Sequence, residues 1–174
     1  MRKGAVTLAL AFIMFVGGSL QSARAAGHSQ GPPPLRDLGW LIGGSWQTID
    51  HGVPLTVKTT HSWSPNGAII EFTTTFITNG QSKNKYDGHF YLDPGTQNVI
   101  VWYAHDDFTI TQAPVEGQRQ QGFSMQFKEA GDSKTLQTYR VVVTKTGADA
   151  YTWELDQQSG SAWQKALTLH FVRS

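Results

Sequence analysis

Cysteine is absent from this chain of 174 residues. Neither a disulfide framework nor a thiolate nucleophile or metal ligand is therefore available to it. The fold must depend on a hydrophobic core alone, and the length suffices for one domain with a core of ordinary size.

The chain also lacks the short motifs of several enzyme classes. It contains no glycine-rich phosphate loop and no paired-histidine zinc motif, and its G-x-S-x-G match, GHSQG at 27–31, stands directly before three prolines and not between a strand and a helix, as a nucleophile turn requires. The motifs therefore indicate no catalytic residue, no metal site and no cofactor, and an enzyme is the less favoured class.

No apolar run is long enough for a membrane-spanning helix, which needs about 20 residues. The longest, Ala5–Val16, follows the basic residues Arg2 and Lys3 and precedes Ala23-Arg24-Ala25, a small-x-small pattern. This order predicts a secretory signal peptide over residues 1–25, cut near Ala25. We expect an exported protein, periplasmic or secreted, with no stable membrane anchor.

Excess charge of either sign is absent as well. The full sequence has 14 Lys and Arg against 13 Asp and Glu residues. Arg2, Lys3 and Arg24 leave with the signal peptide, which carries no acidic residue, so 11 basic side chains remain and the net charge is about −2. A nucleic-acid partner requires a basic patch, and we expect none.

The first part of the mature chain is predicted as a linker and a short helix. Residues 26–34 contain three consecutive prolines, which favour extended backbone over a helix. The pair Gly43-Gly44 is typical of a helix end. One or two helical turns are expected before it, with an apolar face formed by Leu35, Leu38, Leu41 and Ile42.

The remaining sequence alternates apolar and polar residues in short runs. Tyr151, Trp153 and Leu155, for example, alternate with polar neighbours, and turn sequences such as SPNG at 64–67 separate the runs. Strands are expected at 44–50, 55–64, 68–79, 82–92, 98–105, 108–115, 120–129, 135–145, 150–157 and 162–173.

About ten strands in roughly 130 residues must close or stack, because an open sheet of that size leaves long edges. We predict an all-β fold, an up-and-down antiparallel β-barrel of about ten strands over residues 35–174, with the short helix as a plug. A two-sheet sandwich is the alternative, but its crossing connections would be longer.

Gly44-Ser45-Trp46, after a short helix, resembles the G-x-W signature of lipocalins and their relatives. The segments LGWLIGGSW, HSWSPNG and YDGHFYLD are similar to bacterial lipocalin-like domains of unknown function, over most of residues 35–174. The resemblance implies that Arg173 of the last strand packs across Trp46 and helps to close the barrel. Pairing of the first and last strands would then remove both sheet edges.

A ten-stranded barrel is wider than an eight-stranded one, so inward side chains can line a cavity. The favoured hypothesis is non-enzymatic binding of a small, largely apolar ligand there. Trp102 replaces Tyr103 as a lining residue if its strand has the opposite parity, and His61 is also compatible with a purely internal hydrogen bond. The expected lining residues are Thr59, His61, Trp63, Phe72, Tyr103, Met125, Tyr139 and Trp153.

Two other functional classes stay open. One is an enzyme with an acid or base inside the barrel, for which His61 and Glu71 are the candidates, although Glu71 lies on the less apolar face of its strand. The other is a structural or protein-binding barrel with a filled interior.

Two histidine-containing features suggest cofactor or metal binding only weakly. Haem-binding barrels of the nitrobindin type carry a ligand near the position of His170, but an inward Arg173 implies an outward His170. The triplet His105-Asp106-Asp107 contains legitimate metal ligands, yet neighbours in a strand point to opposite faces. A solvated turn is the preferred interpretation of this triplet.

Overall fold

The computed structural model describes residues 31–49, 55–130 and 135–174, so the predicted signal peptide lies outside it. Within these residues a short helix α1 (Pro33–Arg36) and a 3-10 helix η1 (Gly39–Leu41) precede ten strands. Each predicted run corresponds to one strand. The strands are β1 (Ser45–Thr48), β2 (Leu55–Trp63), β3 (Ile70–Thr78), β4 (Gln81–Leu92), β5 (Val99–His105), β6 (Ile110–Pro114), β7 (Gly122–Ala130), β8 (Leu136–Lys145), β9 (Ala150–Ser159) and β10 (Ala162–Arg173).

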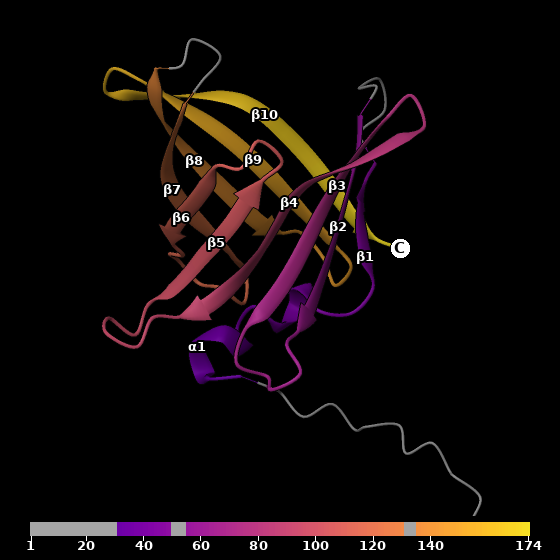
Figure 1. The fold of residues 1–174 in the computed structure, drawn as a ribbon, viewed down its shortest axis with the longest axis vertical. Coiled ribbons are helices and arrows are strands. Elements are labelled where there is room, and N and C mark those ends of the chain that lie inside the picture. The colour runs from indigo at the N-terminus through magenta and orange to yellow at the C-terminus, as the bar shows by residue number, and fades with distance from the viewer. Residues whose placement is uncertain (1–30, 50–54, 131–134) are drawn as a thin grey trace, which may run out of the picture.

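The ten strands form one antiparallel sheet of order β6-β5-β4-β3-β2-β1-β10-β9-β8-β7. This sheet curls into a nearly closed barrel, which confirms the predicted fold (Figure 1). The two edges of this sheet are β6 and β7, which follow each other in the middle of the sequence. We call the place where these two edge strands meet the seam. At the seam, the described residues share one backbone bridge, in which Glu116 and Ser124 exchange hydrogen bonds of 2.9 and 3.0 Å. The expectation that pairing of β1 with β10 removes both edges was therefore wrong.

The meander places its connections alternately at two ends of the barrel. Helices α1 and η1 lie across the end that holds the β2–β3, β4–β5, β6–β7 and β8–β9 connections (Figure 1). There Trp40 Nε1 donates to the Arg119 carbonyl at 2.7 Å, and Gln120 Nε2 donates to Asp37 Oδ1 at 2.8 Å. We call this the plugged end and the opposite one the far end.

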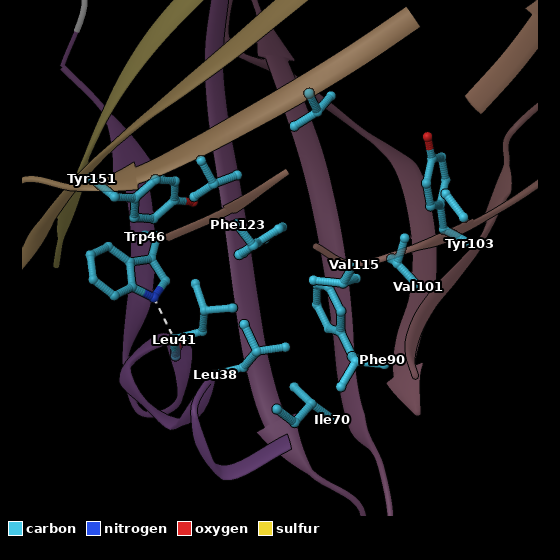
Figure 2. Packing of buried hydrophobic residues seen from close by; sticks show 14 of the residues in the cluster. Leu38, Leu41, Trp46, Ile70, Phe90, Val101, Tyr103, Val115, Phe123 and Tyr151 are labelled. Carbon is cyan, nitrogen blue, oxygen red and sulfur yellow. Dashed lines mark hydrogen bonds between the residues drawn. The ribbon is translucent and has the colours of Figure 1, made fainter. Parts of the chain in front are cut away.

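The plug is apolar on its inner side, as its leucine spacing predicts. Leu35, Leu38 and Leu41 are almost completely buried and pack in one cluster with the inward residues Ile70 and Phe123 (Figure 2). Burial of this face stabilises helices that are too short to form alone.

Helix α1 begins inside the segment predicted to be extended. Pro33 and Pro34 occupy its first positions. The prediction that consecutive prolines forbid a helix here was wrong, because the first N–H groups of a helix have no intrahelical partner and proline loses nothing there. The helix thus takes in the last two residues of the segment predicted as a linker.

Trp46 and Arg173 join the first strand, the last strand and the plug. The two residues are directly opposite in the β1–β10 ladder, and the guanidinium carbon lies 4.3 Å from the centroid of the indole ring. Trp46 is completely buried, and its Nε1 donates to the Leu41 carbonyl at 2.8 Å. This cation–π pair in a buried setting contributes about 1–2 kcal/mol.

The Arg173 guanidinium also binds carbonyls at the end of the plug. Its Nη1 donates to Ile42 at 2.8 Å and to Gly43, and its Nη2 donates to Trp40 at 2.7 Å. Gly43 and Gly44 have φ angles of 85° and 89°, a conformation that favours glycine. A Cβ on Gly44 would lie 3.2 Å from the Arg173 Cγ, so the glycine pair is required for this close approach.

Arg173→Lys should lower the free energy of unfolding by about 1–3 kcal/mol, because an ammonium group keeps the charge but loses the planar stack and the fork of donors. Urea denaturation measures the change. Gln164→Ala, an exposed position on the same strand, is the control and should stay within about 0.5 kcal/mol of the parent protein. Equal stability of the two variants would contradict the closing role of Arg173.

Candidate functional site

The barrel encloses a cavity of about 350 Å³. This volume lies within the range of small-molecule sites. Aromatic and aliphatic side chains of β2–β5 and β7–β10 line it, and Leu41 of η1 contributes to the lining. Phe72, Met125 and Trp153 point inward and yet are only half-buried. Their uncovered parts face the cavity.

Most of the side chains expected inside the barrel line this cavity. Trp63 does not, although the same parity argument placed it inward. It lies at the last position of β2, at the plugged end, where a Cβ added to Gly31 would come within 2.6 Å of its ring. The predicted residues that line the cavity are Thr59, His61, Phe72, Tyr103, Met125, Tyr139 and Trp153.

The alternation of inward and outward side chains also holds for the residues that were predicted to point away from the barrel interior. Trp102 lies on the outer face and stacks on His89, with ring centroids 4.9 Å apart, so β5 has the parity that turns Tyr103 inward. Glu71 is exposed opposite His89, and His170 is exposed between the buried Leu169 and Phe171. Neither Glu71 nor His170 reaches the interior of the barrel.

His61 lies in the cavity wall among aromatic rings. Its ring centroid is 5.8 Å from that of Phe72 and 6.4 Å from that of Phe90. Burial, with a smaller contribution from the positive charge of Arg173, lowers the pKa of His61 to about 3. Its Nδ1 is buried without a partner among the described residues, so the internal hydrogen bond considered for His61 is not made at this atom. The imidazole is a neutral polar group in the wall.

Two hydroxyl groups lie on neighbouring strands in the same wall. Thr74 Oγ1 donates to Thr59 Oγ1 at 3.1 Å, and both residues line the cavity. This pair offers a second neutral polar contact in a mostly apolar interior.

A polar cluster that the sequence did not reveal lies toward the far end. The Oε1 atom of Glu129 in β7 accepts hydrogen bonds from the hydroxyls of Thr111 (2.5 Å) and Tyr103 (3.2 Å). His105 Nε2 lies 3.0 Å from the same oxygen. These partners belong to β5 and β6, so the cluster crosses the seam. Its side-chain bonds connect the two sides where the backbone ladder is interrupted.

His105 belongs to this cluster and not to a solvated turn, so the preferred interpretation of the triplet was wrong for this residue. Its side chain is only 9% exposed and contacts the ring of Tyr86, with centroids 4.9 Å apart. The position follows from parity, because His105 comes two residues after the inward Tyr103. That signal was available in the sequence.

The two aspartates of the triplet do form a turn with surface partners. Lys83 and Lys85 each place Nζ 2.7 Å from a carboxylate oxygen of Asp106, and their hydrogen bonds lower its pKa to about 2. Asp107 accepts a bond from the Thr109 backbone N–H at 3.0 Å. Among the described residues, no three His, Asp or Glu side chains are grouped to hold a metal ion.

The tyrosine hydroxyls beside Glu129 keep their protons. Burial, and then the charge of Glu129, raises the pKa of Tyr86 to about 12 and shifts the pKa of Tyr103 upward as well. Tyr103 therefore acts as a hydrogen-bond donor to the carboxylate at every ordinary pH.

Comparison with known proteins adds no assignment. No protein-family model matches the chain, and the search of curated proteins finds no similar sequence. In the described part of the chain, no helix is both long and apolar enough to cross a membrane.

Replacing His61 should make the stability of the protein less sensitive to acid. The pKa of His61 is lower in the folded state than in the unfolded state, so the unfolded chain binds a proton first as the pH falls below about 6.5. From pH 7.5 to pH 5.0 the parent protein should lose about 2 kcal/mol more stability than His61→Phe. Urea denaturation at both pH values measures this, and equal losses would refute the neutral, buried state of His61.

Proposed function

We propose that the protein binds a small, largely apolar ligand inside the barrel, without catalysing a reaction on it. The cavity of about 350 Å³, lined mainly by aromatic and aliphatic side chains, is the observation that carries this proposal. A purely structural barrel needs a filled interior, because cavities lower stability. A space of this size is better suited to a ligand.

Binding would be driven by removal of apolar ligand surface from water, at about 25 cal/mol for each Å² buried. The neutral imidazole of His61 and the hydroxyls of Thr59 and Thr74 supply a few polar contacts that orient the ligand. The enzyme alternative has weaker support. Glu71, the carboxylate considered for it, is exposed on the outer face.

We also propose that the chain is a lipocalin-like protein. The G-x-W entry into β1, the Arg173 guanidinium over Trp46 and the plug before β1 support this relation. The leader pattern over residues 1–25 supports export, after which the barrel would meet its ligand in the periplasm or the medium.

Native mass spectrometry of protein purified from its own periplasm or medium tests the proposed function directly. A recurring small molecule that stays bound in the folded protein and is released on denaturation would support it. A protein that never carries a molecule, and that also fails to take up a neutral apolar dye such as N-phenyl-1-naphthylamine, would overturn it.

Filling the cavity should abolish binding of that dye. Met125→Trp places a larger side chain in the cavity and should raise the dissociation constant by about tenfold or more. Gln126→Trp adds the same side chain on the exposed face of the same strand and should leave binding unchanged. Dye fluorescence gives the affinities, and circular dichroism verifies the fold. Equal binding by the two variants would place the dye outside the barrel.

A further inference from the structure

Glu129 is the one charged side chain among the described residues that line the cavity. The rest of the lining is aliphatic or aromatic, apart from threonine hydroxyls and the neutral imidazole of His61. None of the described residues that line the cavity is a lysine or an arginine. An unpaired charge in such surroundings is costly unless donors or a cation compensate it.

The protein supplies donors to one carboxylate oxygen of Glu129. The three contacts from Tyr103, His105 and Thr111 all converge on Oε1. None of the described residues donates to Oε2, and the side chain is 28% exposed. The carboxylate is thus held in place while part of it remains available to a ligand.

Aromatic rings continue on both sides of this carboxylate. Successive ring centroids lie 6.0 Å apart from Phe76 to Tyr86, 5.3 Å from Tyr86 to Tyr103, 6.4 Å from Tyr103 to Phe127 and 5.9 Å from Phe127 to Tyr139. All five rings line the cavity. Ring faces attract cations, and ammonium groups are commonly bound by aromatic rings that surround a site. We call these five residues the ring belt.

We propose that Glu129 and the ring belt bind the ammonium head of an amphipathic amine whose apolar body occupies the cavity. The inference rests on the proposed function and adds the chemical class of the ligand. A cation gains from the carboxylate and from the ring faces in a site that is poor in water. An anionic head would be repelled by the carboxylate of Glu129, so fatty acids and similar anions are disfavoured.

Glu129 also connects the two sides of the seam, and that structural role must be separated from recognition. Glu129→Gln keeps an oxygen that accepts the bonds from Tyr103 and Thr111 and removes only the charge. A matched control is Glu154→Gln. Glu154 lies on the strand face opposite the cavity-lining Trp153 and Leu155, where it pairs with Lys165.

The test is displacement of N-phenyl-1-naphthylamine by decylamine, decanol and decanoate at pH 8, where the amine is charged and free imidazoles are neutral. The parent protein should bind decylamine about tenfold more tightly than decanol, and decanoate most weakly. In Glu129→Gln the advantage of the amine should disappear, while decanol affinity should change by less than about twofold. Glu154→Gln should behave as the parent protein.

A second variant keeps the test decisive if Glu129→Gln folds poorly. Tyr86→Leu removes one ring of the belt and leaves Glu129 in place. It should weaken decylamine binding by about threefold to tenfold and weaken decanol binding by clearly less, because the alcohol loses only apolar contact. Equal affinities for amine and alcohol in the parent protein, or an amine preference that survives both variants, would overturn the inference while leaving the cavity proposal intact. Failure of decanol and the dye to bind would overturn the cavity proposal itself.

Discussion

The stack of Arg173 on Trp46 is the interaction on which the rest of the barrel depends. It lies where the plug, the first strand and the last strand meet, and the same guanidinium binds the carbonyls of Trp40, Ile42 and Gly43. The indole beneath it is completely buried and meets the ring of Tyr151 edge to face, with centroids 4.8 Å apart. Because β1 has only four residues, its backbone ladder alone would hold the two halves of the sheet together weakly. The side chains of Trp46 and Arg173 therefore hold both the β1–β10 pairing and the plug in place, and the plug covers one end of the cavity.

Although β1 pairs with β10, the consecutive strands β6 and β7 form no continuous ladder with each other, so these two are the edges that must be brought together. Side chains complete that closure, chiefly through Glu129 and its partners Tyr103, Thr111 and His105. A carboxylate near an apolar cavity normally lowers stability. The hydroxyls of Tyr103 and Thr111 donate to one of its oxygens, with His105 Nε2 beside it, and these contacts offset that cost and also order the seam. The same residue therefore combines a structural role with the chemistry that we assign to ligand recognition.

The sequence could predict the strands because each has one solvent-exposed and one buried face. The alternation of polar and apolar residues along a strand shows these two faces directly. The more apolar face of each strand was then taken to point inward, and this placed most of the lining residues. Trp63 shows the limit of parity, because facing inward does not tell how far along the barrel a residue lies. Glu129 was missed for a different reason. It comes just before a sequence typical of a turn, where a carboxylate is ordinarily solvated, and the hydroxyls that hold it lie 18 and 26 residues away in the chain. No local pattern encodes such partners.

The two ends of the barrel differ in composition, since one contains the closely packed core and the other contains the side chains that face the cavity. The fully packed residues, such as Leu38, Trp46, Ile70 and Val99, gather at the plugged end and provide the stability that a protein without cysteine must obtain from its core. The rings of the belt and the Glu129 cluster lie toward the far end, where they face the cavity. Because the closing pair of Trp46 and Arg173 lies at the other end, substitutions near the far end can alter the charge and shape of the site while the closure remains intact. This division gives the fold a stable base on which different ligand chemistries can be built.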